Sequence, residues 1–334
     1  MATVLLDGLG AVGIRAARQL VDTPGLDTLL ITARGSAHAA EVAASLGARA
    51  EAIELRPDDP LPAGVDAVAV ALPGPLAAVR AKRALAAGVP FTSTVDDTAA
   101  IDAVLDLDEA ARSAGVLLAP GCGLAPGLAD VLARHAADAL DSVDEIHVAR
   151  AGAAGPACTA AVRRSRRDPA VEWSDGDWRA ERRPNPELVW FPDPIGSREC
   201  APVAVGVALL VRAFPGVRRV TVRFAEPVSR RVTWLGRHGL DEGWGSTRVE
   251  AWGWRGRARE SMVYGLIDRT AIAAGTVLAV TAARLAGIAP GLAARSGPAA
   301  GVHGLAALVE PVPFLAELAR RGVKAAVFEG VAVA

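Results

Sequence analysis

The feature that most constrains the fold is a glycine-rich stretch near the first residue of the sequence. Three glycines with G-x-G-x-x-G spacing separate a short apolar run from a helix-like segment: Gly8, Gly10 and Gly13. In a strand–turn–helix unit the first glycine permits a tight turn, the second lets the backbone approach a pyrophosphate, and the third lets helix and strand pack closely. We therefore predict a dinucleotide cradle in which Ala11 and Val12 open the helix. A tight turn without a ligand is the alternative.

Five further strand-like runs follow the first one and alternate with alanine-rich helical segments. The six runs cover residues 3–7, 28–33, 48–55, 66–72, 90–95 and 115–120. Strands joined by helices form right-handed crossovers, and such units build a parallel sheet that is covered on both faces. We predict an α/β protein with a doubly wound parallel sheet of the Rossmann type.

The composition changes beyond residue 150. Residues 1–150 carry 11 basic and 20 acidic side chains, whereas residues 151–267 carry 19 and 13. All seven tryptophans lie between Trp173 and Trp254. Such a joint shift in charge and aromatic content indicates a second domain.

Two dipeptides in this second part are typical of β-hairpin turns: Asp175–Gly176 and Arg255–Gly256. We therefore expect an antiparallel or mixed sheet here, in an α+β domain that is inserted into the first. The predicted boundaries are 1–123 for the dinucleotide-binding domain, 124–298 for the inserted domain, and 299–334 for a segment that returns to the first domain.

The residues after the second predicted strand distinguish two forms of dinucleotide. NAD sites place an acidic side chain there to accept the ribose hydroxyls, but this sequence has Arg34 and Ser36 with no acid nearby. A guanidinium and a hydroxyl suit a 2′-phosphate, so we predict NADP, with NAD as the alternative. Arg34 is otherwise a solvated loop residue.

Ligands of open parallel sheets bind outside the carboxyl ends of the strands. Leu72 and Pro73 follow the fourth predicted strand and are expected beside the cofactor, while Thr94, Asp96 and Asp97 follow the fifth. Asp97 has an equal alternative as a helix cap, because a helical segment begins directly after it. The predicted cofactor-binding residues are thus Gly8, Gly10, Ala11, Val12, Gly13, Arg34, Ser36, Leu72, Pro73 and Thr94.

The predicted catalytic residues are Asp96 and, second, His303, which lies in a glycine-rich loop as His238 also does. Cys122, in a stretch with three glycines and two prolines, is expected to face the substrate. Arg198 and Arg269 are candidates for binding a substrate carboxylate with two hydrogen bonds. Each also has an ordinary structural interpretation. The three cysteines lack metal-type spacing, so no metal site is predicted.

Four stretches together resemble the saccharopine dehydrogenase-type reductases, which include saccharopine reductase, carboxynorspermidine dehydrogenase and relatives of lysine 6-dehydrogenase. They are the glycine fingerprint, "GVPFTSTVDD", "GCGLAPGLADVLARHA" and "LVEPVPFLAELARRGVKAAVFEG". The resemblance implies a Rossmann domain, an inserted substrate domain that also mediates dimerisation, and NAD(P)-linked chemistry at a carbon–nitrogen bond of an amino acid. The stretch "GVHGLAALVEP" departs from the family pattern at His303.

We therefore expect a cytoplasmic homodimer that reduces an imine or oxidises an amine of an amino-acid-like substrate. No signal peptide or membrane-spanning run is recognised, and the arginines alternate with acids and apolar residues, which argues against nucleic acid as a partner. Two alternatives remain: a synthase that uses NAD(P) without net redox change, and a non-catalytic cofactor sensor.

Overall fold

The first part of the computed structural model is a seven-stranded sheet in which every neighbouring pair of strands is parallel. The structure describes residues 1–153, 155–181, 185–226, 243–289, 300–323 and 330–333. The strand order is β15-β6-β5-β4-β1-β2-β3. The strands are β1 (Ala2–Asp7), β2 (Leu26–Thr32), β3 (Ala50–Ala52), β4 (Ala67–Val70), β5 (Phe91–Ser93), β6 (Leu117–Ala119) and β15 (Gly301–Val302). This order reverses direction at β1 and β4, as the predicted doubly wound sheet requires.

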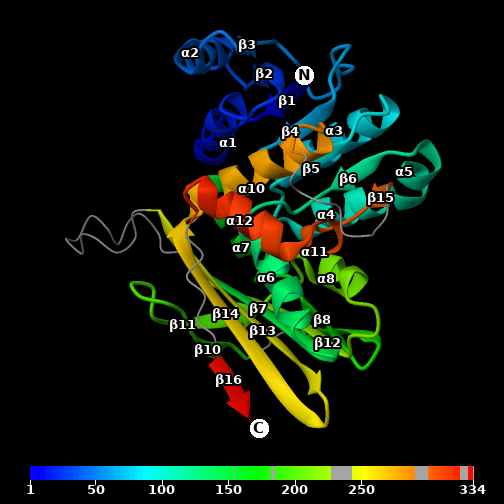
Figure 1. The fold of residues 1–334 in the computed structure, drawn as a ribbon, viewed down its shortest axis with the longest axis vertical. Coiled ribbons are helices and arrows are strands. Elements are labelled where there is room, and N and C mark those ends of the chain that lie inside the picture. The colour runs from blue at the N-terminus through cyan, green and yellow to red at the C-terminus, as the bar shows by residue number, and fades with distance from the viewer. Residues whose placement is uncertain (154, 182–184, 227–242, 290–299, 324–329, 334) are drawn as a thin grey trace.

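Helices cover both faces of this sheet, because side chains of a strand alternate between faces. Leu5 of β1 contributes to the core under α3 and α4, whereas Val4 and Leu6 pack with α1 and α2. The helices of this part are α1 (Ala11–Val21), α2 (Ser36–Leu46), α3 (Gly74–Ala86), α4 (Thr98–Leu105) and α5 (Asp108–Ala114). The fold class predicted from the sequence is confirmed (Figure 1).

A second, mixed sheet of nine strands forms the other half of the molecule (Figure 1). Its main path is β10-β11-β12-β7-β13-β14-β16, and the β8–β9 hairpin pairs with β12. The strands are β7 (Ser142–Gly152), β8 (Ala170–Ser174), β9 (Asp177–Glu181), β10 (Glu187–Trp190), β11 (Ser197–Pro202), β12 (Arg219–Ala225), β13 (Trp244–Arg255), β14 (Ala258–Arg269) and β16 (Gly330–Val333). Both predicted hairpins are confirmed, since Asp175–Gly176 joins β8 to β9 and a turn joins β13 to β14. The second turn lies one residue later than predicted, at Gly256 and Arg257, because Arg255 is the last residue of β13 and pairs with Ala258.

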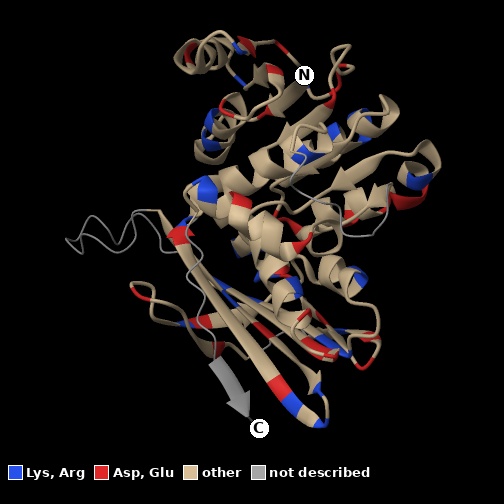
Figure 2. Cartoon of the chain, viewed as in Figure 1, with Lys and Arg blue, Asp and Glu red and all other residues tan. Residues whose placement is uncertain are grey.

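One face of the second sheet packs on the main core, whereas a small cluster around Phe191 covers only part of the opposite, open face. Ile146 and Val148 of β7 belong to the main core with α6 (Leu128–Ala137), which contacts β7, β13 and β14. The intervening residues Glu145 and His147 are half-buried on the opposite face. Figure 2 shows that basic and acidic side chains are interspersed along these strands. The buried face therefore lies toward the first sheet.

The remaining helices connect or cover these two parts. They are α7 (Pro156–Ser165), α8 (Val207–Ala213), α10 (Thr270–Leu285), α11 (Leu305–Leu308) and α12 (Pro311–Arg320). No described helix is both long and apolar enough to cross a membrane.

Two segments pack against a different domain from the one to which the predicted boundaries assign them. Helix α10, assigned to the inserted domain, packs on α1 so closely that a Cβ on Gly275 would lie 2.6 Å from the carbonyl oxygen of Val12. The last strand, expected to return to the first domain, pairs instead with β14 of the second sheet. Of the strands that the structure describes in that segment, β15 alone joins the first sheet. The domain boundaries themselves stay a prediction.

Candidate functional site

The glycine-rich loop has the geometry of a dinucleotide cradle. Gly8 has a φ of +102°, and a Cβ on it would lie 2.6 Å from the carbonyl oxygen of Ala71. A Cβ on Gly13 would lie 1.8 Å from the carbonyl oxygen of Gly8, so neither position accepts a side chain. Gly10 has open space around its Cα, and no side chain caps α1 at this residue. The first N–H groups of α1, at Ala11 and Val12, thus remain for an external acceptor, and the loop fits a pyrophosphate.

The other predicted cofactor residues lie at the carboxyl ends of neighbouring strands. Arg34 and Ser36 are exposed just beyond β2, and Leu72 and Pro73 lie between β4 and α3. Leu72 comes close to the turn, since its Cδ2 atom is 3.0 Å from the Cβ position of Gly8. Thr94 follows β5 and its N–H donates to the carbonyl of Val70.

His38, in the first turn of α2, also lies at this edge. Its Nε2 atom lies 3.1 Å from the carbonyl oxygen of Leu9, inside the glycine loop. Because a carbonyl only accepts, Nε2 carries the hydrogen. The contact ties the first turn of α2 to the glycine loop.

A polar cluster joins Asp96 to the second half of the molecule. Asp96 follows β5, and its Oδ2 atom accepts from Nη1 of Arg150 at 3.2 Å and from Sγ of Cys158 at 2.6 Å. Arg150 comes from β7 and also donates to the carbonyl of Ala125 at 2.8 Å. Its guanidinium stacks over the ring of Phe224, 4.0 Å from the centroid. Arg150 is therefore held on three sides and fixes one carboxylate oxygen.

Burial determines which group of this cluster carries a proton. Burial raises the pKa of Cys158 to about 12, so the thiol keeps its proton at neutral pH and donates it to Asp96. Both donors bind the same oxygen, Oδ2; no described residue donates to Oδ1 of Asp96. The cluster thus holds a carboxylate with one oxygen saturated and the other open.

Asp97 caps a helix, which is one of the two roles considered for it in the sequence analysis. It caps α4 by accepting from the N–H of Ala100 at 3.1 Å, and it accepts from Arg164 of α7 at 2.9 Å. Helix α7 thus contacts both neighbouring carboxylates, through Cys158 and Arg164.

The remaining predicted site residues do not contact Asp96. The fully buried thiol of Cys122 donates to the carbonyl of Ala119, and burial raises its pKa to about 12, so this side chain does not line an open site. His303 follows β15 and contacts the carbonyl of Ala300, and burial lowers its pKa. Arg198 lies in β11 and Arg269 at the end of β14.

The sequence analysis missed Arg150 and Cys158. Arg150 carried a weak signal, as a charge on the core-facing register of β7. Cys158 carried none, because its partner lies 62 residues away in the sequence. His238 lies outside the described residues.

No family model matches the chain. The structure is similar to apo saccharopine dehydrogenase (L-Glu forming) from Saccharomyces cerevisiae, with a TM-score of 0.70, 13% sequence identity and 100% of both chains covered. The chain has the saccharopine dehydrogenase fold. It is also similar to C. glutamicum DAP dehydrogenase in complex with DAP (TM-score 0.50, 15% identity, 96% of this chain and 99% of that one). A putative myo-inositol dehydrogenase from Sinorhizobium meliloti gives a TM-score of 0.50 at 14% identity, over 96% and 95% of the two chains. The predicted resemblance to saccharopine dehydrogenase therefore holds for the fold.

Proposed function

We propose that the protein is an NADP-dependent oxidoreductase that acts on a carbon–nitrogen bond of an amino-acid-like substrate. The observation that carries the proposal is the state of Asp96. This carboxylate lies at the carboxyl edge of the dinucleotide-binding sheet, and its Oδ1 atom has no described donor, while Arg150 and Cys158 hold Oδ2. A substrate nitrogen that gains or loses a proton suits such an oxygen.

The residues at the first sheet fit the cofactor. The loop from Gly8 to Gly13 leaves room for a pyrophosphate, and Arg34 and Ser36 supply a guanidinium and a hydroxyl for a 2′-phosphate. When bound, the nicotinamide supplies or accepts the hydride, and the protein contributes orientation and electrostatics. NAD is the alternative cofactor.

The residues around Asp96 then have separate tasks. Oδ1 of Asp96 accepts a proton from the substrate amine, or stabilises the cationic imine next to it. Arg150 and Cys158 position the carboxylate and do not themselves contact the reacting nitrogen in this proposal. Arg198 and Arg269 stay predictions as substrate-binding residues, and His303 stays the second catalytic candidate. The fully buried Cys122 has no part in this proposal.

The first experiment separates the proposal from its alternatives. Purified protein is incubated with NADPH or NADH and a panel of amines, amino acids and keto acids with ammonia, and nicotinamide absorbance is followed. We expect net absorbance change and faster turnover with NADPH. Substrate turnover without net change supports a synthase, and cofactor binding without turnover supports a sensor.

The second experiment tests Asp96. Asp96→Asn keeps the shape of the side chain but removes the proton acceptor, so we expect turnover to fall about 100-fold or more. Asp97→Asn is the matched control, because asparagine caps helices as well as aspartate does, and we expect it to stay within a few fold of wild type. Unchanged turnover in Asp96→Asn removes this residue from the mechanism.

The homodimer and the cytoplasmic location stay predictions. Sedimentation equilibrium of the full chain measures the oligomeric state and so tests the homodimer.

A further inference from the structure

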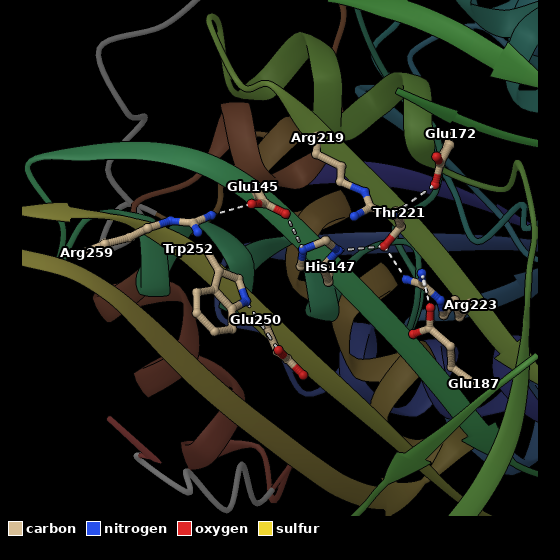
Figure 3. A network of polar contacts seen from close by, with 10 residues as sticks. All are labelled: Glu145, His147, Glu172, Glu187, Arg219, Thr221, Arg223, Glu250, Trp252 and Arg259. Atoms are coloured by element: carbon tan, nitrogen blue, oxygen red, sulfur yellow. Dashed lines mark hydrogen bonds and ion pairs between the residues drawn. The ribbon is translucent and has the colours of Figure 1, made fainter. Parts of the chain in front are cut away.

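A polar cavity lies on the open face of the second sheet, on the side of β7 and β12 opposite to Asp96. Strand β7 presents Glu145 and His147 to it, and β12 presents Arg219 and Arg223, with Thr221 between them in contact with His147 and Arg223 (Figure 3). The volume is about 350 Å³, which is within the range of small-molecule sites. Arg150 and Phe224 lie on the other face of the same two strands. The cavity is therefore separate from the proposed catalytic cluster.

The carboxylates that line the cavity are all engaged. Glu145 pairs with Arg259 and contacts Nε2 of His147, which lies 3.2 Å away. Glu250 accepts from Nε of Arg248 at 2.7 Å. The third, Glu187, accepts from Nη2 of Arg223 at 2.8 Å. The acidic side chains thus offer little to a further cation.

In contrast, two of the arginines have N–H groups without a hydrogen-bond acceptor in the described part of the chain. Arg223 is only 8% exposed and donates to Thr221 and Glu187, yet its Nε has no acceptor in the described part of the chain. Nε of Arg219 is likewise buried without an acceptor, and its guanidinium lies 3.7 Å from Glu172. Buried N–H donors without an acceptor are rare. Both arginines belong to β12 and line this cavity.

The rest of the lining restricts the ligand. Four arginines and three glutamates line the cavity, and burial lowers the pKa of His147, so this histidine adds no charge at neutral pH. Ala149, Val189 and Trp252 supply apolar surface. A ligand with an oxyanion and a short carbon chain complements both features.

We propose that this cavity is a binding site for a small organic anion, whose carboxylate or phosphate oxygens accept from Arg219 and Arg223 above Thr221. The oxyanion accepts from the guanidinium N–H groups of the two arginines that line the cavity. The site does not depend on the proposed NADP-linked activity, and its ligand does not contact Asp96.

The test is calorimetric titration of the full-length protein without nicotinamide. Butyrate and inorganic phosphate are the two anionic probes, and butylamine is the probe of opposite charge. We expect saturable binding of an anionic probe with a dissociation constant in the millimolar range, and none of butylamine. Stronger binding of butyrate identifies a carboxylate ligand, and stronger binding of phosphate identifies a phosphorylated one.

Three variants locate the binding. Arg223→Met and Arg219→Met are expected to weaken the better probe at least tenfold, whereas Arg257→Met, which removes the same charge from the exposed β13–β14 turn, stays within twofold. Circular dichroism checks that each variant is folded, and Arg219, with a 44% exposed side chain, is the safer of the two. Absence of saturable anion binding to the wild type overturns the proposal. Equal binding of butylamine, or wild-type affinity in Arg219→Met, does so as well.

Discussion

At the scale of a single residue, Asp130 is a carboxyl group that the fold buries in the first turn of α6. It is 3% exposed and accepts from the N–H of Gly127 at 3.1 Å, and burial raises its pKa from 3.8 to about 7. A pKa raised in the folded state means that the unfolded chain releases the proton first. The contribution of Asp130 to stability is therefore present below pH 3.8 and is lost as the pH rises toward 7 and beyond.

Asp130→Asn removes this dependence because an amide does not titrate. Between pH 5 and about pH 8, we expect the wild type to lose stability relative to the variant. Urea denaturation at each pH measures the free energy of unfolding of both proteins, and the difference, variant minus wild type, should increase with pH. Asp168→Asn, at an exposed position, is the control for a simple change in net charge. A difference between variant and wild type that is constant with pH contradicts the prediction.

At the scale of the elements, a buried ion pair joins the end of β1 to α3. Asp7, directly before the glycine loop, accepts from Nε of Arg80 at 2.8 Å, and the two side chains are 7% and 2% exposed. Arg80 also donates to the carbonyl of Arg56 beyond β3. Burial raises the pKa of Asp7, and the nearby guanidinium opposes that shift. The pair therefore holds together the end of β1, helix α3 and the segment after β3, near the edge where the cofactor is proposed to bind.

Removal of one partner leaves an uncompensated charge in the interior. We expect Arg80→Met to lower the free energy of unfolding by about 3–5 kcal/mol, and Asp7→Asn/Arg80→Met to lose less than the sum of the two single variants. Urea denaturation at pH 7 of the four proteins in the cycle measures the coupling. Additive losses would show that the two side chains stabilise the fold independently.

The sequence predicts the first sheet well, because local rules determine it. The six parallel strands follow from apolar runs alternating with helices, and the close approach at Gly13 follows from the glycine spacing. Contacts between distant segments lack such a signal. The partners of Asp96 lie 54 and 62 residues away, and β16 adds to β14 through backbone hydrogen bonds that any apolar strand can form. Arg150 and Cys158 therefore became visible only when the packing of β7 and α7 was known.

At the scale of the whole molecule, Arg150 links the two halves, to which we assign separate tasks. Its guanidinium comes from the second sheet and binds Asp96 and the carbonyl of Ala125 in the loops of the first part. The glycine loop and Arg34 lie on other loops and make no described contact with it. Cofactor binding and proton transfer are therefore expected to respond differently to the loss of this side chain.

Arg150→Met tests this division. We expect the affinity for 2′,5′-ADP, measured by calorimetry, to stay within about twofold of wild type, because the adenosine half of the cofactor is proposed to bind to the first sheet alone. Turnover is expected to fall at least tenfold, because the carboxylate of Asp96 loses the donor that orients it. Arg150→Lys restores the charge but neither the planar fork nor the stacking on Phe224, so its turnover should lie between the two. Equal losses of 2′,5′-ADP affinity and turnover would show instead that Arg150 supports the first sheet as a whole.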